Sequence, residues 1–427
     1  MHTIFALATA RGKSGVAVIR ISGPDAHAVA GRMAGELPGP GRFALRRLRN
    51  ADGGLLDEAL VLRFDAPRSF TGEDSVELQL HGSVAVIRAV ERAIAETGLA
   101  RMAEPGEFTR RALMNGNLDL AQVEGLSDLI AAETELQRTQ AQGLFIGQMR
   151  AFADACRADL LRAAALIEAT IDFADEEVPV DVSPEVGTLI DRVLGAIDQQ
   201  LHGFSGAERL RLGFEVAIIG EPNVGKSTLL NRIAGRDIAI TSEVAGTTRD
   251  VLEVRVDLDG LPVTFLDTAG LRESEDAVER IGISRARDRA VAADLRILLE
   301  DGTLAGEGFD PGVPIDLRYR TKADLTGTGV SGLTGQGVDQ VLADVAAALS
   351  ERVFDLPVAS HERHRQAMVR AQTALAEAQR AFDGGDIGAE IIALHLRDAA
   401  TALDSLIGRM DVEAVLGEIF AQFCIGK

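Results

Sequence analysis

The chain has 427 residues, of which 46% are apolar and 26% charged, so it is long enough for several packed domains. Its net charge of −21 argues against a protein that coats nucleic acid by charge alone. Two distant cysteines, Cys156 and Cys424, predict a reducing compartment rather than a disulfide framework. No stretch reaches the ~18 apolar residues of a membrane span. No basic region precedes the first apolar run, so we do not expect a signal peptide.

Residues 1–118 alternate short apolar runs with turn residues, which predicts an α+β domain. We expect strands at 4–9 and 16–22 on either side of an RGKSG turn, an alternating strand at 75–82 and a helix at 86–96.

Residues 119–212 are predicted to be the first part of a helical domain. Apolar residues recur at helical spacing between 149 and 171 and again between 186 and 204. The segment 171–185 between them carries six acids, no base and two prolines, which predicts a solvated loop.

Residues 213–353 alternate strand and helix patterns, which predicts a mixed or parallel sheet. The pair Asp259-Gly260 predicts a hairpin turn between two apolar runs. Residues 354–427 are helical again, so we expect the α/β domain to be inserted into the helical domain.

A phosphate-binding loop opens the α/β segment. Residues 220–231 read GEPNVGKSTLLN after an apolar run, with two glycines five residues apart. Such glycines let backbone N–H groups turn toward a phosphate, while Lys226 supplies charge and the Ser227 hydroxyl can ligate Mg²⁺. GKS also occurs at 12–14, but Leu7 stands where the first glycine would be, so a plain turn is predicted there.

Four downstream motifs favour GTP over ATP. Asp267 ends a strand in DTAG, where its carboxylate can hold Mg²⁺ through water and Gly270 can meet the γ-phosphate. Thr248 in GTTRD is a candidate Mg²⁺ ligand. In TKAD, Asp324 can accept the two hydrogen bonds that guanine donates and adenine lacks, and the SGL that begins at Ser331 predicts the last base-contacting loop. Their order predicts a GTPase.

The chain resembles the MnmE (TrmE) family of tRNA-modification GTPases over nearly its whole length. The resemblance is carried by ARGKSGVAVIRISG, SFTGEDSVEL, PGEFTRRAL, LDLAQVE, GEPNVGKS, AGTTRD, DTAGLRESEDAVERIGI and the terminal FCIGK. It implies a Ras-like GTPase domain inserted into a helical domain, behind an N-terminal domain that resembles tetrahydrofolate-binding folds and forms a homodimer.

The resemblance also implies partners and chemistry. A cytoplasmic, membrane-free enzyme would act with an FAD-containing partner, MnmG (GidA), on C5 of the wobble uridine of certain tRNAs, which bind mainly through the complex. The product would carry an aminomethyl or carboxymethylaminomethyl group, with a methylene- or 5-formyl-tetrahydrofolate as the folate ligand and one-carbon source.

Residue roles follow from the same resemblance. Leu271 stands where Ras-type enzymes carry a water-orienting Gln, and Glu279 matches the family's catalytic glutamate, assisted by Lys226 and Thr248. K⁺ replaces an arginine finger, and its implied ligands are Asn223, Ser242, Val244 and Thr247. The full set implied for GTP and its ions is Asn223, Val224, Gly225, Lys226, Ser227, Thr228, Ser242, Val244, Thr247, Thr248, Asp267, Gly270, Thr321, Lys322, Asp324 and Ser331. Arg20, Glu77, Asn117 and Lys427 match folate-contacting positions.

The sequence departs from the family pattern at three places. Thr321 stands where the family usually has Asn, and Asn117 stands where it often has Lys or Arg. The link at 301–314 is short and glycine-rich, so a helix that normally covers one sheet face is expected to be missing or reduced.

Other interpretations remain open from sequence. A regulatory GTPase of ribosome assembly would share every GTPase motif but would need neither the folate-like region nor FCIGK. Metal-dependent hydrolysis through His361 and His364 is a weaker hypothesis, because a solvated helix face is the more ordinary reading of such a pair. Cys424 could be a nucleophile or a packing residue.

Overall fold

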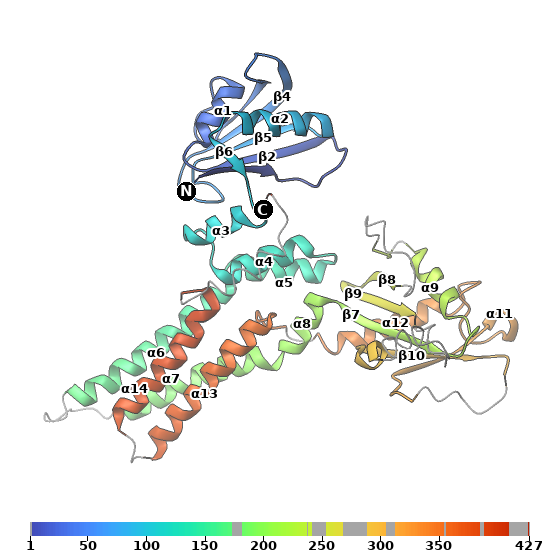
Figure 1. Ribbon diagram of the computed structural model, residues 1–427. Helices are drawn as coiled ribbons and strands as arrows, with labels where there is room; N and C mark the ends of the chain where they lie inside the picture. The colour runs from blue at the N-terminus through green and yellow to red at the C-terminus, as the bar shows by residue number, and fades with distance from the viewer. Residues whose placement is uncertain are drawn as a thin grey trace, which may run out of the picture. The chain divides into compact units, whose positions relative to one another are not determined.

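The computed structural model of the chain describes residues 2–172, 182–236, 238–240, 253–267, 288–304, 312–353, 356–384, 388–409 and 426 (Figure 1). The chain divides into two units, one formed by residues 1–127 with 404–427 and the other by residues 128–403.

The first unit is built on a six-stranded sheet in the order β3-β4-β5-β2-β1-β6. Its strands are β1 (Thr3–Leu7), β2 (Val16–Ser22), β3 (Phe43–Arg49), β4 (Leu55–Phe64), β5 (Ser75–His81) and β6 (Ala100–Met102). All neighbours are antiparallel except β1 and β6. Helices α1 (Ala26–Ala34) and α2 (Val84–Glu96) bury one face of the sheet (Figure 1). Helix α3 (Glu107–Met114) places Phe108 against Ile4 and Ala6 on the other face.

Helix α4 (Leu120–Ala131) crosses the boundary between the units, and the second unit continues with helices. These are α5 (Glu135–Phe145), α6 (Gln148–Asp172), α7 (Ser183–His202), α8 (Phe204–Leu212), α13 (Glu362–Gly384) and α14 (Ala389–Asp404), which is followed by the short helix η1 (Ser405–Ile407). Helix α13 lies beside α7, where Gln379 donates a 2.9 Å hydrogen bond to Asp191. Segments about 190 residues apart therefore form one helical bundle, as expected for a helical domain with an insertion.

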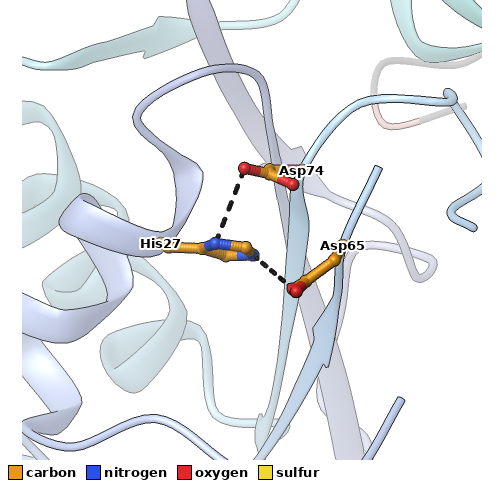
Figure 2. A group of neighbouring side chains, drawn as sticks. All are labelled: His27, Asp65 and Asp74. Carbon is orange, nitrogen blue, oxygen red and sulfur yellow. Dashed lines mark ion pairs between the residues drawn. The ribbon is translucent and has the colours of Figure 1, made fainter. Parts of the chain in front are cut away.

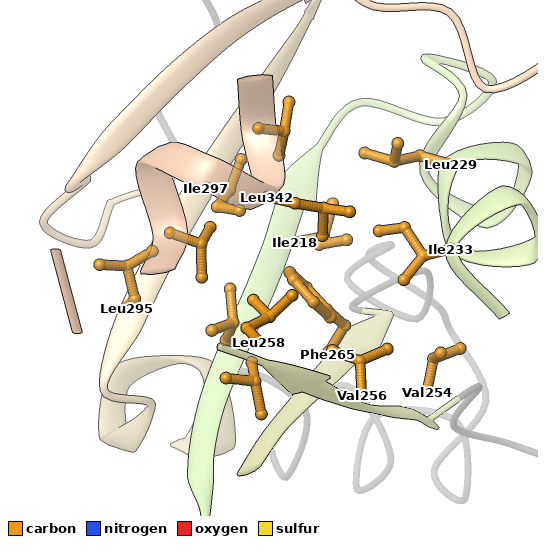
Figure 3. Packing of buried hydrophobic residues seen from close by; sticks show 14 of the residues in the cluster. Ile218, Leu229, Ile233, Val254, Val256, Leu258, Phe265, Leu295, Ile297 and Leu342 are labelled. Atoms are coloured by element: carbon orange, nitrogen blue, oxygen red, sulfur yellow. The ribbon is translucent and has the colours of Figure 1, made fainter. Parts of the chain in front are cut away.

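The inserted segment forms a five-stranded sheet in the order β11-β10-β7-β9-β8. Its elements are β7 (Phe214–Gly220), α9 (Lys226–Ala234), β8 (Glu253–Leu258), β9 (Leu261–Asp267), β10 (Leu295–Asp301), β11 (Leu317–Thr321), α11 (Ala323–Thr326) and α12 (Val338–Ser350). Only β8 runs antiparallel, through a turn in which Asp259 and Gly260 both have positive φ, of 52° and 89°. Leu229, Leu342 and Phe265 pack in the core that α9 and α12 form with this sheet (Figure 3).

The opposite face of this sheet shows how the short link between β10 and β11 is accommodated. The described parts of the link, residues 302–304 and 312–316, contain no helix. Val313 and Ile315 from the link pack against buried Ala217, Ile219 and Leu298. Irregular chain thus covers part of this sheet face.

Two sequence expectations need correction at this level. Phe204, expected on the same helix as Val186, instead begins α8, because α7 ends at His202 and Gly203 separates the two helices. The sequence predicts a loop for the acidic segment 171–185, but its first two residues end α6 and its last three begin α7, while 173–181 lie outside the described residues. Among the described residues, no helix combines the length and apolar character required to cross a membrane.

Candidate functional site

The P-loop connects β7 to α9, as its sequence predicts. Gly220 has a φ of 158°, and a Cβ added there would lie 2.5 Å from the Leu299 carbonyl oxygen, so no side chain fits. Gly225 caps α9 with a left-handed φ of 108°. The Lys226 ammonium donates hydrogen bonds to the carbonyls of Gly220 at 2.7 Å and Glu221 at 2.9 Å. The lysine is therefore held over the loop, at the N-terminus of a helix that favours a phosphate.

Ser227 and Asp267 form the candidate Mg²⁺ site. The Ser227 hydroxyl donates a 2.7 Å hydrogen bond to Oδ2 of Asp267, at the end of the neighbouring strand β9. Asp267 is only 6% exposed, and its Oδ1 atom has no hydrogen-bond partner among the described residues. A buried carboxylate oxygen without a partner is costly, so its presence fits a site for a cation and its water.

The guanine-binding motif meets the P-loop across one cavity. The cavity measures about 300 Å³ and is lined by Asn223, Val224, Gly225, Thr228, Leu229, Thr321, Lys322, Asp324, Leu325, Val330, Ser331, Gly332 and Leu333. These residues come from two stretches about 100 residues apart, and the size suits a nucleoside.

Side chains around Asp324 hold it for base recognition. The Ser331 hydroxyl donates a 2.7 Å hydrogen bond to Oδ1 of Asp324, which fixes the carboxylate while leaving it further acceptor capacity. Lys322 forms an ion pair with Asp301 at the end of β10. Hydrogen bonds from Lys322 and then from Thr303 lower the pKa of Asp301 to about 2, so this carboxylate is ionised at neutral pH.

Thr321, which stands where the family usually has Asn, makes its side-chain hydrogen bond within the sheet. The Thr321 hydroxyl donates a 3.1 Å hydrogen bond to the Glu300 carbonyl, within the sheet. The base-contacting loop is instead tied to α9 by Gly332, where an added Cβ would lie 2.6 Å from the Thr228 and Leu229 backbone. Arg232 of α9 also donates a 2.9 Å hydrogen bond to the Gly332 carbonyl. No sequence motif marks Arg232, and its role follows only from the fold.

Several predicted site residues lie outside the described residues. These are Ser242, Val244, Thr247, Thr248, Gly270, Leu271, Glu279, Cys424 and Lys427. Of the implied K⁺ ligands only Asn223 is described, and it sits in the P-loop with a left-handed φ of 62°.

Arg20 and Glu77 meet on the sheet of the first unit, on the face opposite α1 and α2. They are register partners on β2 and β5 and form a 2.9 Å ion pair, with each side chain 21% exposed. The Arg20 guanidinium lies 5.2 Å from the Phe70 ring centroid and 5.7 Å from that of Phe108. The amide of Asn117 donates to the carbonyls of Ser69, at 2.9 Å, and Phe70, at 3.3 Å. Three of the four implied folate positions are thus connected through the loop that carries Phe70.

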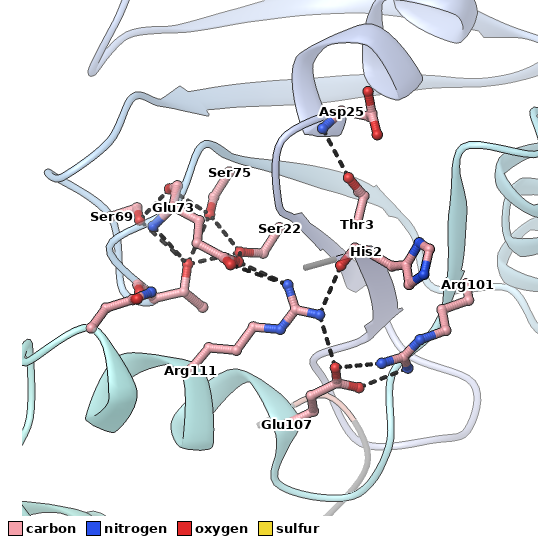
Figure 4. Close-up of polar contacts among 12 residues, drawn as sticks. His2, Thr3, Ser22, Asp25, Ser69, Glu73, Ser75, Arg101, Glu107 and Arg111 are labelled. Carbon is pink, nitrogen blue, oxygen red and sulfur yellow. Dashed lines mark hydrogen bonds and ion pairs between the residues drawn. The ribbon is translucent and has the colours of Figure 1, made fainter.

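A buried ionic network anchors α3 beneath this surface (Figure 4). Arg111 donates to Glu73 at 3.0 Å and to Oε1 of Glu107 at 2.8 Å, and Arg101 donates to both carboxylate oxygens of Glu107, at 2.7 and 2.9 Å. Burial alone would raise the pKa of Glu107, but hydrogen bonds from Arg101, the Glu104 amide and Arg111 lower this pKa to about 2. The network holds Phe108 and the chain toward Asn117 in place.

Gly426, from the terminal FCIGK, is buried against β1. A Cβ added at Gly426 would lie 2.0 Å from the Leu7 carbonyl oxygen, and the residue has a left-handed φ of 106°. The chain therefore approaches the backbone of the first unit closely at this point.

Two histidine groups outside these sites have ordinary structural roles. His364 is fully buried and His361 forms a 2.8 Å ion pair with Asp128, so the expected solvated helix face is wrong. His27 lies between two carboxylates, with Nε2 3.4 Å from Asp65 and Nδ1 3.6 Å from Asp74 (Figure 2). The carboxylates approach different ring nitrogens, which is the geometry of ion pairs rather than of a shared metal ion.

The buried cysteine of the first long helix has no catalytic features. Cys156 packs in α6, where burial, and to a smaller extent the Asp159 charge, raises the pKa of its thiol to about 11. A thiol with that pKa is protonated at neutral pH and chemically inert.

Together, the strand–P-loop–helix unit, the Ser227–Asp267 pair and the guanine cavity define a P-loop GTPase. Family models extend this assignment over nearly the whole chain. One described as "GTP-binding protein TrmE N-terminus" matches residues 3–117, and one described as "MnmE helical domain" matches residues 120–424. The chain belongs to the MnmE family.

Full-length relatives agree with the family models. A protein of Roseobacter denitrificans named tRNA modification GTPase MnmE is 55% identical over 432 residues, with all of both chains covered. One of the same name from Jannaschia sp. is 57% identical over 430 residues, again with all of both chains covered.

Solved structures resemble only part of the chain. An Era variant of Aquifex aeolicus bound to GDP and AlF4⁻ is 26% identical, covers 38% of this chain and 66% of its own, and has a TM-score of 0.26. The G domain of the T. maritima FeoB iron transporter is 21% identical, covers 33% of this chain and 98% of its own, and has a TM-score of 0.23.

Proposed function

We propose that this chain hydrolyses GTP to GDP in a K⁺-dependent reaction and, with an FAD-containing partner of the MnmG (GidA) type, modifies C5 of the wobble uridine of certain tRNAs. One observation carries the proposal: the P-loop and the guanine motif line a single cavity in a chain with full-length relatives named tRNA modification GTPase MnmE. The reaction would take place in the cytoplasm.

The described residues suit the early steps of hydrolysis. P-loop N–H groups and the α9 N-terminus bind the phosphates, and Lys226 is already held above the loop by two carbonyls. Ser227 and Thr248 would ligate Mg²⁺, with Asp267 binding through water, and the bound ion would neutralise charge on the β- and γ-phosphates.

Glu279 is proposed to complete the reaction. It would orient a water and accept its proton while the water oxygen bonds to the γ-phosphorus and the bond to the bridging β–γ oxygen breaks. This role is needed because Leu271 replaces the Gln of Ras-type enzymes. Asn223, Ser242, Val244 and Thr247 would hold K⁺ where other GTPases place an arginine.

A homodimer is proposed to form through the first unit. Phe43 and Leu45 of edge strand β3 are 68% and 59% exposed, and they pair with Leu62 and Leu60 on the face opposite α1 and α2. Soluble proteins seldom leave such an apolar patch uncovered. The patch ends at the Arg47–Glu58 ion pair, which offers both signs of charge, so a second copy can face it symmetrically.

Arg20, Glu77, Asn117 and Lys427 are proposed to bind a methylene- or 5-formyl-tetrahydrofolate. Glu77 can accept hydrogen bonds from pterin N–H groups, and Arg20 offers a planar donor array braced by Phe70 and Phe108. The folate would supply the one-carbon unit that is transferred to the tRNA.

Nucleoside analysis of tRNA tests the proposed function. Digested tRNA from cells lacking the gene should contain unmodified wobble uridine, and expression of the wild-type chain should restore the modification. A chain with Lys226→Ala should fail to restore it, while Glu362→Gln, at an exposed ion pair with Arg365, should succeed. Intact modification in the deletion strain, together with a defect in ribosome assembly, would favour a regulatory GTPase instead.

A further inference from the structure

Four exposed cations gather on the first unit at the loop between β1 and β2. Arg11 and Lys13 belong to the RGKSG turn, and Arg88 and Arg92 lie one turn apart on α2. The Ser14 amide donates a 3.0 Å hydrogen bond to the Gly82 carbonyl, which fixes the loop beside the start of α2. We call these four residues the loop–helix surface.

The side chains of the loop–helix surface have no internal charge partners. Within the described part of the chain, none of its four side chains forms an ion pair or hydrogen bond. Other arginines of the same unit are used internally, for example Arg63 with Asp65 and Arg111 with Glu107. In a chain with a net charge of −21, four unpaired neighbouring cations are available to an outside anion.

Lysine usage singles out the same loop. The chain has 44 lysines and arginines, but only four of these are lysines: Lys13, Lys226, Lys322 and Lys427. Lys226 and Lys322 belong to the two nucleotide motifs, and Lys427 matches a folate position. Lys13 is the one lysine that the proposed GTP and folate sites do not use.

The surface is hollowed beside Arg11. A cavity of about 180 Å³ between loop and helix is lined by Arg11, Arg88 and Glu91, among others, and one of about 380 Å³ by Arg11, Glu91 and Met102. Leu7 lines both cavities, and its carbonyl is the group that Gly426 approaches. Arg11 and Arg88 therefore lie beside the end of β1, which Gly426 also approaches.

We infer that the loop–helix surface binds the sugar-phosphate backbone of the tRNA substrate. The inference rests on the proposed function, because it supplies a place where an acidic chain can hold tRNA. The surface offers three guanidinium groups and one ammonium beside two cavities, and none of its four residues is aromatic, so it suits phosphates rather than stacked bases. Glu91 is the acid that faces both cavities, and it would disfavour phosphate inside them and direct it to the outer cations.

Charge-matched variants of the full chain test the inference. The loop pair is Arg11→Gln with Lys13→Gln, and the helix pair is Arg88→Gln with Arg92→Gln. The control pair, Arg42→Gln with Arg320→Gln, removes the same charge from exposed arginines elsewhere. Binding of a fluorescent tRNA transcript is measured by anisotropy between 50 and 200 mM KCl, and GTP hydrolysis is measured in parallel.

The loop pair and the helix pair should each weaken tRNA binding about tenfold. Each should also reduce the slope of log Kobs against log salt concentration by about 1.5, since each lost phosphate contact reduces that slope by ~0.7–0.9. GTP hydrolysis and the control pair should stay close to wild type. Equal losses in all three pairs would show a general charge effect and overturn the inference. So would lost modification with unchanged tRNA affinity, which would assign the surface to the partner protein.

The two levels of proposal fail separately. If the wild-type chain and its partner protein produce no modified uridine, the proposed function fails. If they modify tRNA, and the loop and helix pairs bind it as tightly as wild type, only the inference about the loop–helix surface fails.

Discussion

Replacing Glu107 by Gln should destabilise the first unit by about 3 kcal/mol at pH 7. Glu107 is 2% exposed and accepts hydrogen bonds from Arg101 and Arg111. Its pKa falls from 4.5 to about 2 in the folded chain. A shift of one pKa unit corresponds to about 1.4 kcal/mol, so the charge of this carboxylate contributes about 3 kcal/mol to the stability of the fold. Gln keeps the shape but removes that charge, and it leaves Arg111 with Glu73 as its remaining ionic partner.

The effect has a defined pH dependence. Because the folded-state pKa is depressed, the stabilisation is complete above about pH 5 and is lost as the pH falls through 4.5 toward 2. The difference between wild type and Glu107→Gln should therefore be largest at neutral pH and should shrink by more than half at pH 3.

Hydrogen–deuterium exchange of the full chain measures the change locally. Peptides from β1, β2 and β5 should open about 100-fold more often in Glu107→Gln at pH 7, while peptides from β7 and β10 should be unaffected. Thermal unfolding followed by circular dichroism at pH 7 and pH 3 supplies the pH comparison. Glu104→Gln is the control, because its ion pair with Arg110 is exposed and contributes less than about 1 kcal/mol. If the two variants exchanged alike, or if the Glu107→Gln deficit persisted undiminished at pH 3, the charge of Glu107 would not be the cause.

Four further predictions concern the nucleotide site. Initial rates of GTP hydrolysis should be higher in KCl than in NaCl at equal ionic strength and should rise more than linearly with protein concentration; equal rates would contradict the K⁺ site. Glu279→Ala should slow hydrolysis ~10²–10⁴-fold with nearly unchanged GTP affinity, whereas parallel loss of binding would mean a structural role. Asp324→Asn should shift preference toward xanthine nucleotides, while Thr321→Asn should tighten GDP modestly; unchanged base selectivity in the first variant would refute the placement of Asp324. Arg232→Ala should raise the Kd for GDP several-fold by freeing Gly332, and Arg320→Ala serves as its exposed control.

Local signals explain why much of the fold was predictable from sequence. The P-loop glycines, the Asp259-Gly260 turn and the alternating strand Ser75–His81 each encode their conformation within a few residues. The MnmE resemblance then correctly predicted the family and the inserted arrangement. The helix break at Gly203 was missed, because the apolar spacing of α7 continues to Phe204.

Long-range contacts explain what the sequence did not reveal. Arg232 is an ordinary exposed helix residue until the fold brings the Gly332 carbonyl to it, 100 positions away. His361 looked like part of a solvated face because its partner, Asp128, lies 233 positions earlier. A sequence pattern relates residues on the same helix or strand. These two contacts instead join residues on different elements, so they depend on how the elements pack together.

Asn117 illustrates how a change of residue type can alter the role of a position rather than merely weaken it. Read from sequence, a neutral amide replaces a cation and removes one charge contact to folate. In the fold, the same amide donates to the Ser69 and Phe70 carbonyls, and Phe70 in turn packs under the Arg20 guanidinium. A neutral donor at this position can still contribute to an anion site, because it positions the loop that supports the remaining cation. In the proposed folate site, Arg20 would be the central cation, with Asn117 supporting the loop that carries Phe70.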